Sequence, residues 1–132
     1  MRYMLDTNIC SYILKNHPVE VLKKFEEVGV GNICISTIVL AELYYGAARH
    51  PKGVVIRREI DDFTSRLLVI SWDEVAADHY GSIRASLEKT GTLVGAMDML
   101  IAAHARSCGA TLVTNNQREF ERIKGLASIN WV

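Results

Sequence analysis

Short apolar runs that end abruptly in polar, helix-capping residues recur along this chain and constrain its fold more than any other feature. Tyr3–Leu5 is followed directly by Asp6–Asn8, and Ile33–Ile35 is followed by Ser36 and Thr37. Apolar runs of this length are typical of buried strands. Asp, Asn, Ser and Thr side chains cap helices by accepting hydrogen bonds from free N–H groups of the first turn. The pattern therefore predicts units in which a buried strand leads directly into a helix.

The rest of the chain continues this alternation. Further strands are expected at Leu67–Ile70, Ala110–Val113 and, as an edge strand, Ser128–Trp131. Helices are expected over Ile9–Leu14, from Pro18 through Phe25, from Ile38 to a stop around Gly46–Pro51, over Val54–Arg66, from Asp73 through Leu87, over Asp98–Ser107 and in a short turn ending at Phe120. Short strands that alternate with helices indicate βαβ units. We expect a three-layer α/β/α sandwich around a mostly parallel sheet of four to five strands.

Length and charge limit the classes of protein. The chain has 132 residues, with 15 Lys and Arg against 15 Asp and Glu, so its formal net charge is zero. That length predicts one domain with a single core, covering residues 1–132. A balanced charge argues against a polybasic DNA-coating protein, which carries a large cationic excess. It leaves a nucleic-acid enzyme possible, because a basic surface can be offset by acids clustered elsewhere.

Cysteine spacing and hydropathy bear on the compartment. Cys10, Cys34 and Cys108 are widely spaced and form no CxxC pair, which favours free thiols over a zinc ribbon or disulfide scaffold. Their apolar neighbours predict burial, with Cys108 partly exposed beside Gly109. The first residues lack the apolar run of a signal peptide, and no run approaches the roughly 18 apolar residues of a membrane-spanning helix. We expect a cytoplasmic protein.

Carboxylates in apolar surroundings are the candidates for chemistry. Asp6 follows the first strand, Glu42 is a lone charge in an apolar helix, Asp98 opens a buried helix, and Glu119 lies one turn beyond Thr114 after the fourth strand. Open α/β sheets bind ligands beyond the carboxyl ends of their strands. Buried carboxylates that converge repel one another unless divalent cations neutralise them. A site without His or Cys suits Mg²⁺ or Mn²⁺, which clamp the reacting oxygens of a phosphodiester.

Structural explanations exist for three of these acids. Asp6 could simply cap the following helix, and Asp98 could interact with the positive N-terminal end of its own helix. Glu119 lies beside Arg118 and Arg122, which would suit a surface ion pair. Glu42 has no such explanation, because the segment from 38 to 48 contains no Lys or Arg and Glu42 is not at a helix start. Sequence alone leaves their convergence open.

At these positions the chain resembles the PIN-domain ribonucleases, and specifically the VapC toxins of bacterial toxin–antitoxin pairs. The resemblance covers the chain from end to end, in order and at family-like spacing. It is carried by Met4–Asn8, by Ser36 with Ala41-Glu42-Leu43 and Gly46, by Asp98–Ala105, and by Leu112–Asn116 with Glu119 and Phe120. One such motif would be weak evidence, but four together are strong.

The resemblance implies a function and a set of site residues. Asp6, Glu42 and Asp98 match the family's metal ligands. Many members carry an Asp where this chain has Asn116, so Glu119 is expected as the fourth acid, and Thr114 is expected to position a water through its hydroxyl. The implied activity is Mg²⁺-dependent endonucleolytic cleavage of RNA, with Mn²⁺ as a substitute, leaving 5′-phosphate and 3′-hydroxyl ends.

The resemblance also implies partners. A VapB-type antitoxin is expected to wrap the toxin and insert residues into the acidic pocket, and the pair is expected to bind its own operator DNA. Homodimers are usual in this family. Among enteric-type relatives, which this sequence resembles most, the substrate is initiator transfer RNA, cut in the anticodon loop. Candidates for contacts with the RNA backbone are Arg49, Arg57, Arg58, Arg84, Arg106 and Arg118.

Two other functions deserve comparison. A haloacid-dehalogenase-like phosphatase also begins with a strand followed by Asp-x-Asp, but here the second position is Asn8, and no downstream Lys lies in an obvious partner motif. A non-catalytic PIN-like module would act only through its antitoxin and operator DNA. Pure binding gives no reason to retain several costly buried carboxylates, so an intact set of acids disfavours it.

Overall fold

The computed structural model describes residues 2–132 and shows a five-stranded sheet in which every strand pairing is parallel. The strand order is β3-β2-β1-β4-β5. The predicted α/β architecture with a mostly parallel sheet is confirmed. The strands are β1 (Tyr3–Leu5), β2 (Ile33–Ser36), β3 (Leu68–Ile70), β4 (Thr111–Val113) and β5 (Ser128–Ile129), the last of which lies at an edge as expected.

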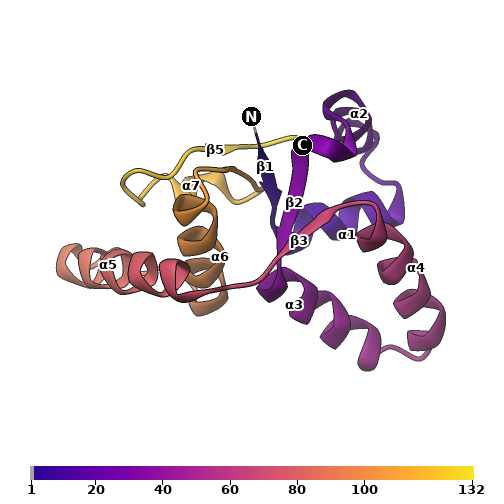
Figure 1. Cartoon of the computed structure of the whole chain (residues 1–132), viewed down its shortest axis with the longest axis horizontal. Helices are drawn as coiled ribbons and strands as arrows, with labels where there is room; N and C mark the ends of the chain where they lie inside the picture. The colour runs from indigo at the N-terminus through magenta and orange to yellow at the C-terminus, as the bar shows by residue number, and fades with distance from the viewer. Residues whose placement is uncertain (1) are drawn as a thin grey trace.

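Helices cover both faces of this sheet (Figure 1). Two of them, α5 and α6, lie on one side, and α1, α2 and α4 lie on the other, while α3 continues beyond the end of β2 and packs against α4. The helices are α1 (Thr7–Lys15), α2 (Val19–Val28), α3 (Thr37–Ala48), α4 (Gly53–Ser65), α5 (Glu74–Thr90), α6 (Ala96–Ser107) and α7 (Gln117–Phe120), with a short 3₁₀ turn η1 (Val30–Asn32).

The first apolar run forms the central strand of the sheet, and this position explains its apolar character. β1 lies between β2 and β4, with Met4 paired to Cys34 on one side and to Leu112 on the other. Those three side chains are fully buried, as expected for a parallel strand covered on both faces. Because β1 is central, the residue that follows it, Asp6, emerges in the middle of the sheet's carboxyl edge.

Polar side chains at strand ends cap the following helices. The Asp6 carboxylate accepts the Ile9 N–H at 2.9 Å at the start of α1. The Ser36 hydroxyl accepts the Ile38 N–H at 3.0 Å, so Ser36 rather than Thr37 is the cap of α3. The predicted strand-then-helix units therefore form as expected, and Asp6 does act as a helix cap.

One helix start was predicted wrongly. α6 begins at Ala96, with Gly95 at the cap position, so Asp98 lies inside the first turn and does not open the helix. Glycine is tolerated as an N-cap because it adopts the required extended backbone, although it has no side chain to mark the position. Asp98 remains near the positive end of α6, but no side-chain cap bond forms there.

The expectations for the thiols are confirmed. Cys10 and Cys34 are buried, Cys108 is half-buried, and all are free. Within residues 2–132, no helix combines the length and the apolar character needed to cross a membrane.

Candidate active site

The first two site residues come from neighbouring strands. Leu5 and Val113 are register partners, and the Asp6 N–H donates to the Val113 carbonyl at 3.0 Å, so Asp6 and Thr114 follow side by side at the carboxyl edge of the sheet. The Thr114 hydroxyl is hydrogen-bonded to the Asp6 carboxylate. The same Thr114 oxygen accepts the Asn116 N–H at 2.9 Å, which leaves its proton for Asp6.

Asp6 is a buried carboxylate held by several donors. Its side chain is 6% exposed, and burial raises the pKa of Asp6 above its ordinary value. The Thr114 hydroxyl and the Ile9 N–H oppose that shift because they stabilise the charged form, whereas the negative charge of Glu42 adds to it. Asp6 is therefore oriented by the chain and already lies within the electrostatic influence of a second acid.

Asp98 is the residue whose pKa is affected by all three of the other acids. The pKa of Asp98 is raised to about 6, first by burial and then by the charges of Asp6, Glu119 and Glu42. Like charges nearby disfavour ionisation. The other three predicted acids, from the end of β1 and from α3 and α7, therefore all lie within electrostatic range of Asp98 on α6. We define Asp6, Glu42, Asp98 and Glu119 as the acidic cluster.

Glu42 is joined to the first motif by a hydrogen bond that the sequence did not reveal. The Thr7 hydroxyl donates to the Glu42 carboxylate, across a separation of 35 residues. This contact ties the first residue of α1 to the second turn of α3. As expected, no cation of the described residues pairs with Glu42, and its hydrogen-bond partner within those residues is this hydroxyl.

The ion pair considered for Glu119 does not form. Within residues 2–132, neither Arg118 nor Arg122 makes a salt bridge to Glu119. Adjacent helical residues do not face one another, and the Arg122 guanidinium donates instead to the Leu93 carbonyl at 3.1 Å. Asn116 lies at the start of α7, where its side chain makes no cap bond.

The acidic cluster suits a hard divalent cation in the chemistry of its donors. Its potential ligands are all carboxylate oxygens, and the repulsion that raises the pKa of Asp98 is what a divalent cation would relieve. In the described part of the chain, no three His, Cys, Asp or Glu side chains stand in the close grouping of a ready-made metal site. The residues therefore fit such an ion by donor type and charge.

The arginines named as backbone contacts divide into two groups. Arg57 pairs with Asp61, Arg84 pairs with Glu88, and Arg106 donates to the Lys124 carbonyl at 2.9 Å. The other three make no salt bridge within residues 2–132: Arg49, Arg58 and Arg118. These three therefore keep their charge free for a ligand.

Sequence reasoning missed two sets of hydrogen bonds that involve α6, one made by Trp72 and one made by His104. The Trp72 indole N–H donates to the Leu100 carbonyl of α6 at 2.9 Å, and the Trp72 backbone N–H donates to the Thr37 hydroxyl at 3.1 Å. In the other set, the ring of His104 on α6 is hydrogen-bonded to the Ser36 hydroxyl. A buried His in an otherwise apolar helix is the one signal that could have suggested it.

Comparisons with known proteins establish the family to which the chain belongs. A family model described as the PIN domain matches residues 3–126. The chain is 47% identical over 132 residues to Ribonuclease VapC2 of Haemophilus influenzae, covering 100% of this chain and 99% of that protein. It is 45% identical to the tRNA(fMet)-specific endonuclease VapC of Shigella flexneri, covering 99% and 98%.

Solved structures extend the agreement to the fold. The structure of VapBC2 from Rickettsia felis, bound to a DNA fragment from its promoter, superposes with a TM-score of 0.93 at 43% identity, and the match covers 100% of both chains. Full-length identity of this order, a matching family model and a shared fold lead to one conclusion. The chain belongs to the PIN-domain family and is a VapC ribonuclease toxin of the VapBC toxin–antitoxin type.

Proposed function

We propose that this ribonuclease is a Mg²⁺-dependent endonuclease that cuts initiator transfer RNA in the anticodon loop and so inhibits translation in the cytoplasm. The observation that carries the metal-dependent chemistry is the acidic cluster, in which burial and then the charges of three other acids raise the pKa of Asp98 to about 6. The name of the Shigella flexneri relative, which specifies tRNA(fMet), supports the substrate.

In this proposal Asp6, Glu42, Asp98 and Glu119 hold the cation, with Mn²⁺ able to replace Mg²⁺. When bound, the cation lowers the pKa of a coordinated water and stabilises negative charge on the phosphoryl group. The chain's own contribution is orientation. The Asp6 carboxylate is fixed by Ile9 and Thr114, and the Glu42 carboxylate is fixed by Thr7.

Thr114 is the proposed positioning group for the attacking water. Its side chain is fully buried, and its hydroxyl lies between the Asp6 carboxylate and the Asn116 N–H. A hydroxyl held in this way has a fixed orientation and keeps one lone pair with which to accept a hydrogen bond at one defined point of the site. Thr114 would therefore reduce the freedom of the water without itself exchanging a proton with the substrate.

The proposed partners of this chain are inferred from the complexes of its relatives. Relatives of this chain have been crystallised as VapBC complexes on DNA, including the complex from Rickettsia felis. We extend this to a VapB-type antitoxin for this chain, to operator DNA bound only through the toxin–antitoxin complex, and to a homodimer of the toxin.

The test uses purified, antitoxin-free protein and total transfer RNA, with Mg²⁺ or with EDTA. We expect wild type to cleave with Mg²⁺ and not with EDTA, and Asp98→Asn to be inactive although folded. Asp78→Asn is the matched control, because Asp78 is an exposed carboxylate on α5. Sequencing of the RNA ends identifies the substrate, the cut position and the 5′-phosphate.

Each negative result has a distinct meaning. Equal cleavage by wild type and Asp98→Asn would contradict the role of the acidic cluster. A folded wild type that binds its antitoxin but cleaves no RNA with Mg²⁺ would favour the non-catalytic module. A covalent phosphate on Asp6 would favour the phosphatase, although Asp6 is buried and already bonded to two donors.

A further inference from the structure

One face of α3 runs from the acidic cluster to a positively charged end. Glu42, Gly46 and Arg49 are spaced four and three residues apart, so they lie along one side of the helix. Seven residues of α-helix rise about 10 Å, which places Arg49 roughly that far from Glu42 along the axis. Tyr45 adjoins this row, three residues after Glu42 and four before Arg49.

A groove follows this face of the helix. It has a volume of about 380 Å³ and is lined on the α1 side by Thr7, Ser11 and Lys15 and on the α3 side by Glu42, Gly46 and Arg49. We call this hollow the α1–α3 groove. It begins at Glu42, inside the acidic cluster, so any chain that occupies the groove also reaches the proposed site of cleavage.

The glycine in the wall of the groove is not required by packing. A Cβ added at Gly46 would meet nothing within 4 Å, and the backbone there is ordinary helix. Glycine in a helix interior is unfavourable relative to alanine. Where such a glycine lines a groove, as Gly46 does, it leaves room for a ligand to approach the helix backbone. Gly46 keeps the groove open beside Glu42.

Two cations, Lys15 and Arg49, line the groove, and an exposed aromatic ring lies against Arg49. The Arg49 guanidinium lies 5.5 Å from the centre of the Tyr45 ring, and Tyr45 is 67% exposed. Lys15 lines the same groove and is also exposed. Neither Lys15 nor Arg49 makes a salt bridge within the described residues, although Glu59 of α4 also lines the groove. Free cations beside an exposed aromatic ring are the usual means of binding a single nucleic-acid strand.

We propose that the α1–α3 groove binds the RNA strand next to the cleaved phosphodiester. In this subsite Arg49 and Lys15 contact a phosphate, Tyr45 stacks on a base, and the strand passes over Gly46. The inference rests on the proposed ribonuclease function and names a binding site for its substrate. A segment of a protein partner is the competing occupant, and the experiment separates the two.

The decisive variant is Gly46→Ala, with Gly81→Ala as its matched control. Gly81 lies inside α5, and a Cβ there also meets nothing within 4 Å. Because alanine favours helix, both variants should melt a few degrees above wild type. Only Gly46→Ala should weaken binding of a fluorescently labelled anticodon stem-loop RNA, measured in EDTA so that no cleavage occurs. We expect its Kd to rise about fivefold or more.

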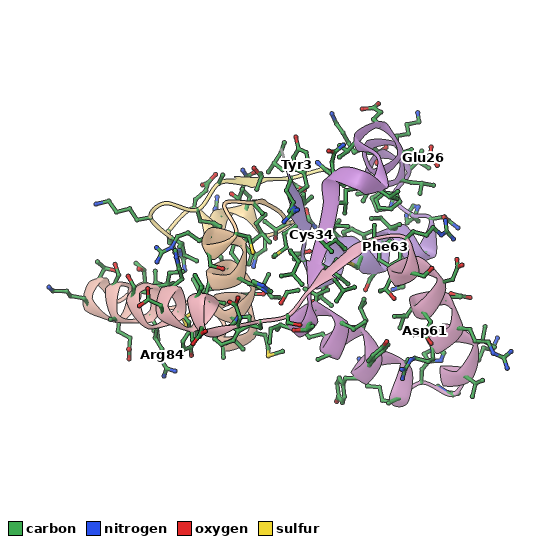
Figure 2. All side chains as sticks on the ribbon, in the orientation of Figure 1. Tyr3, Glu26, Cys34, Asp61, Phe63 and Arg84 are labelled. Atoms are coloured by element: carbon green, nitrogen blue, oxygen red, sulfur yellow. The ribbon has the colours of Figure 1, made fainter. Side chains whose placement is uncertain are left out.

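Charge and stacking are tested by Arg49→Ala and Tyr45→Ala. Arg84→Ala is the control, because Arg84 is paired with Glu88 and is not one of the candidate arginines left free for a ligand. Arg84 lies on α5, on the other side of the sheet from α4, the helix that carries Asp61 in Figure 2 and whose Glu59 lines the groove. Both test variants should raise the Kd and the KM while leaving kcat at saturating RNA nearly unchanged. Arg49→Ala should also lower the slope of log Kd against log salt by about one, as expected for a lost phosphate contact.

The outcomes distinguish this inference from the proposed function. Unchanged RNA affinity in Gly46→Ala and Arg49→Ala, while wild type still cleaves RNA, would overturn the subsite alone. Loss of antitoxin binding in these variants with RNA affinity intact would also overturn it, in favour of a protein segment. A wild type that binds the stem-loop but never cleaves RNA contradicts the proposed function, whereas the affinity comparison among variants still decides the subsite.

Discussion

The Ser36 hydroxyl and the His104 ring nitrogen Nδ1 lie 2.7 Å apart in the buried interior and join the end of β2 to α6. Ser36 stands six residues before Glu42, and His104 stands six residues after Asp98. The pair therefore connects the two helices that carry these acids. The Ser36 oxygen accepts the Ile38 N–H and still has a proton and a second lone pair, so it bonds to His104 Nδ1 in either ring tautomer.

The first prediction is that Ser36 and His104 act as a unit. Ser36→Ala removes a helix cap and leaves His104 Nδ1 unpaired, and His104→Leu removes the ring partner of the Ser36 hydroxyl. Each single variant should lose about 1–2 kcal/mol of unfolding free energy. The double variant should lose about 1 kcal/mol less than the sum of the two, because the shared bond is broken only once. Urea denaturation of all four proteins measures this, and strictly additive losses would contradict it.

The second prediction concerns Asp98 in metal-free protein. Since folding raises the pKa of Asp98 from 3.8 to about 6, the folded state holds its proton more tightly than the unfolded chain. This group's contribution to stability is therefore present at low pH and is lost as the pH rises from about 4 to 6. Asp98→Asn should be more stable than wild type at pH 7, by about 1–2 kcal/mol after allowance for solvent screening, and nearly equal at pH 4.

Two controls sharpen this comparison. Burial lowers the pKa of His104, which destabilises the protein as the pH falls, but that effect is common to wild type and Asp98→Asn and cancels in the difference. Adding Mn²⁺ at pH 7 should raise the Tm of wild type more than that of the variant, because the variant lacks one carboxylate. A Tm difference between the two metal-free proteins that does not vary with pH would show that the raised pKa of Asp98 is not the cause of the difference in stability.

Local patterns predicted much of the fold. Tyr3–Leu5 and Ile33–Ile35 are short apolar runs followed by capping residues, and both the strand and the cap depend on neighbours in sequence. The acids were predicted for the same reason, since a charge such as Glu42 stands out in an apolar helix. The start of α6 was missed because Gly95, its cap, has no side chain that signals a helix start.

Contacts between distant residues were beyond the reach of such patterns. The bonds from Thr7 to Glu42 and from Trp72 to Leu100 join segments 35 and 28 residues apart. They depend on the strand order and on how closely the helices approach, and neither quantity leaves a periodic signal in the sequence. The ion pair considered for Glu119 was wrong for the same reason, because adjacency along the chain does not determine which way a side chain points.

The third prediction concerns thiol chemistry. Burial raises the pKa of Cys34 to about 11 and raises the pKa of Cys10 well above its ordinary value, while both side chains are fully buried. A thiol reacts through its thiolate, so both should be inert in the native protein. A colorimetric thiol reagent should label at most Cys108 at pH 8, and all three cysteines once the chain is unfolded in urea. Rapid labelling of a second thiol in native protein would contradict the packing of β1 and β2.

The last prediction concerns the turn between α3 and α4, which sets the position of Arg49. Gly53 opens α4 so close to α3 that an added Cβ would clash with the carbonyl oxygen of Ala47. That oxygen belongs to the backbone and cannot rotate away, so Gly53→Ala must push the two helices apart. We expect a loss of about 1–3 kcal/mol in urea denaturation, opposite in sign to the gain of about 0.5–1 kcal/mol expected for Gly81→Ala. Because the shift displaces Arg49 from the row that begins at Glu42, the Kd for the stem-loop RNA should rise as well. A Gly53→Ala protein as stable as wild type would show that the turn has room for a side chain and that glycine there does not set the geometry of α3 and α4.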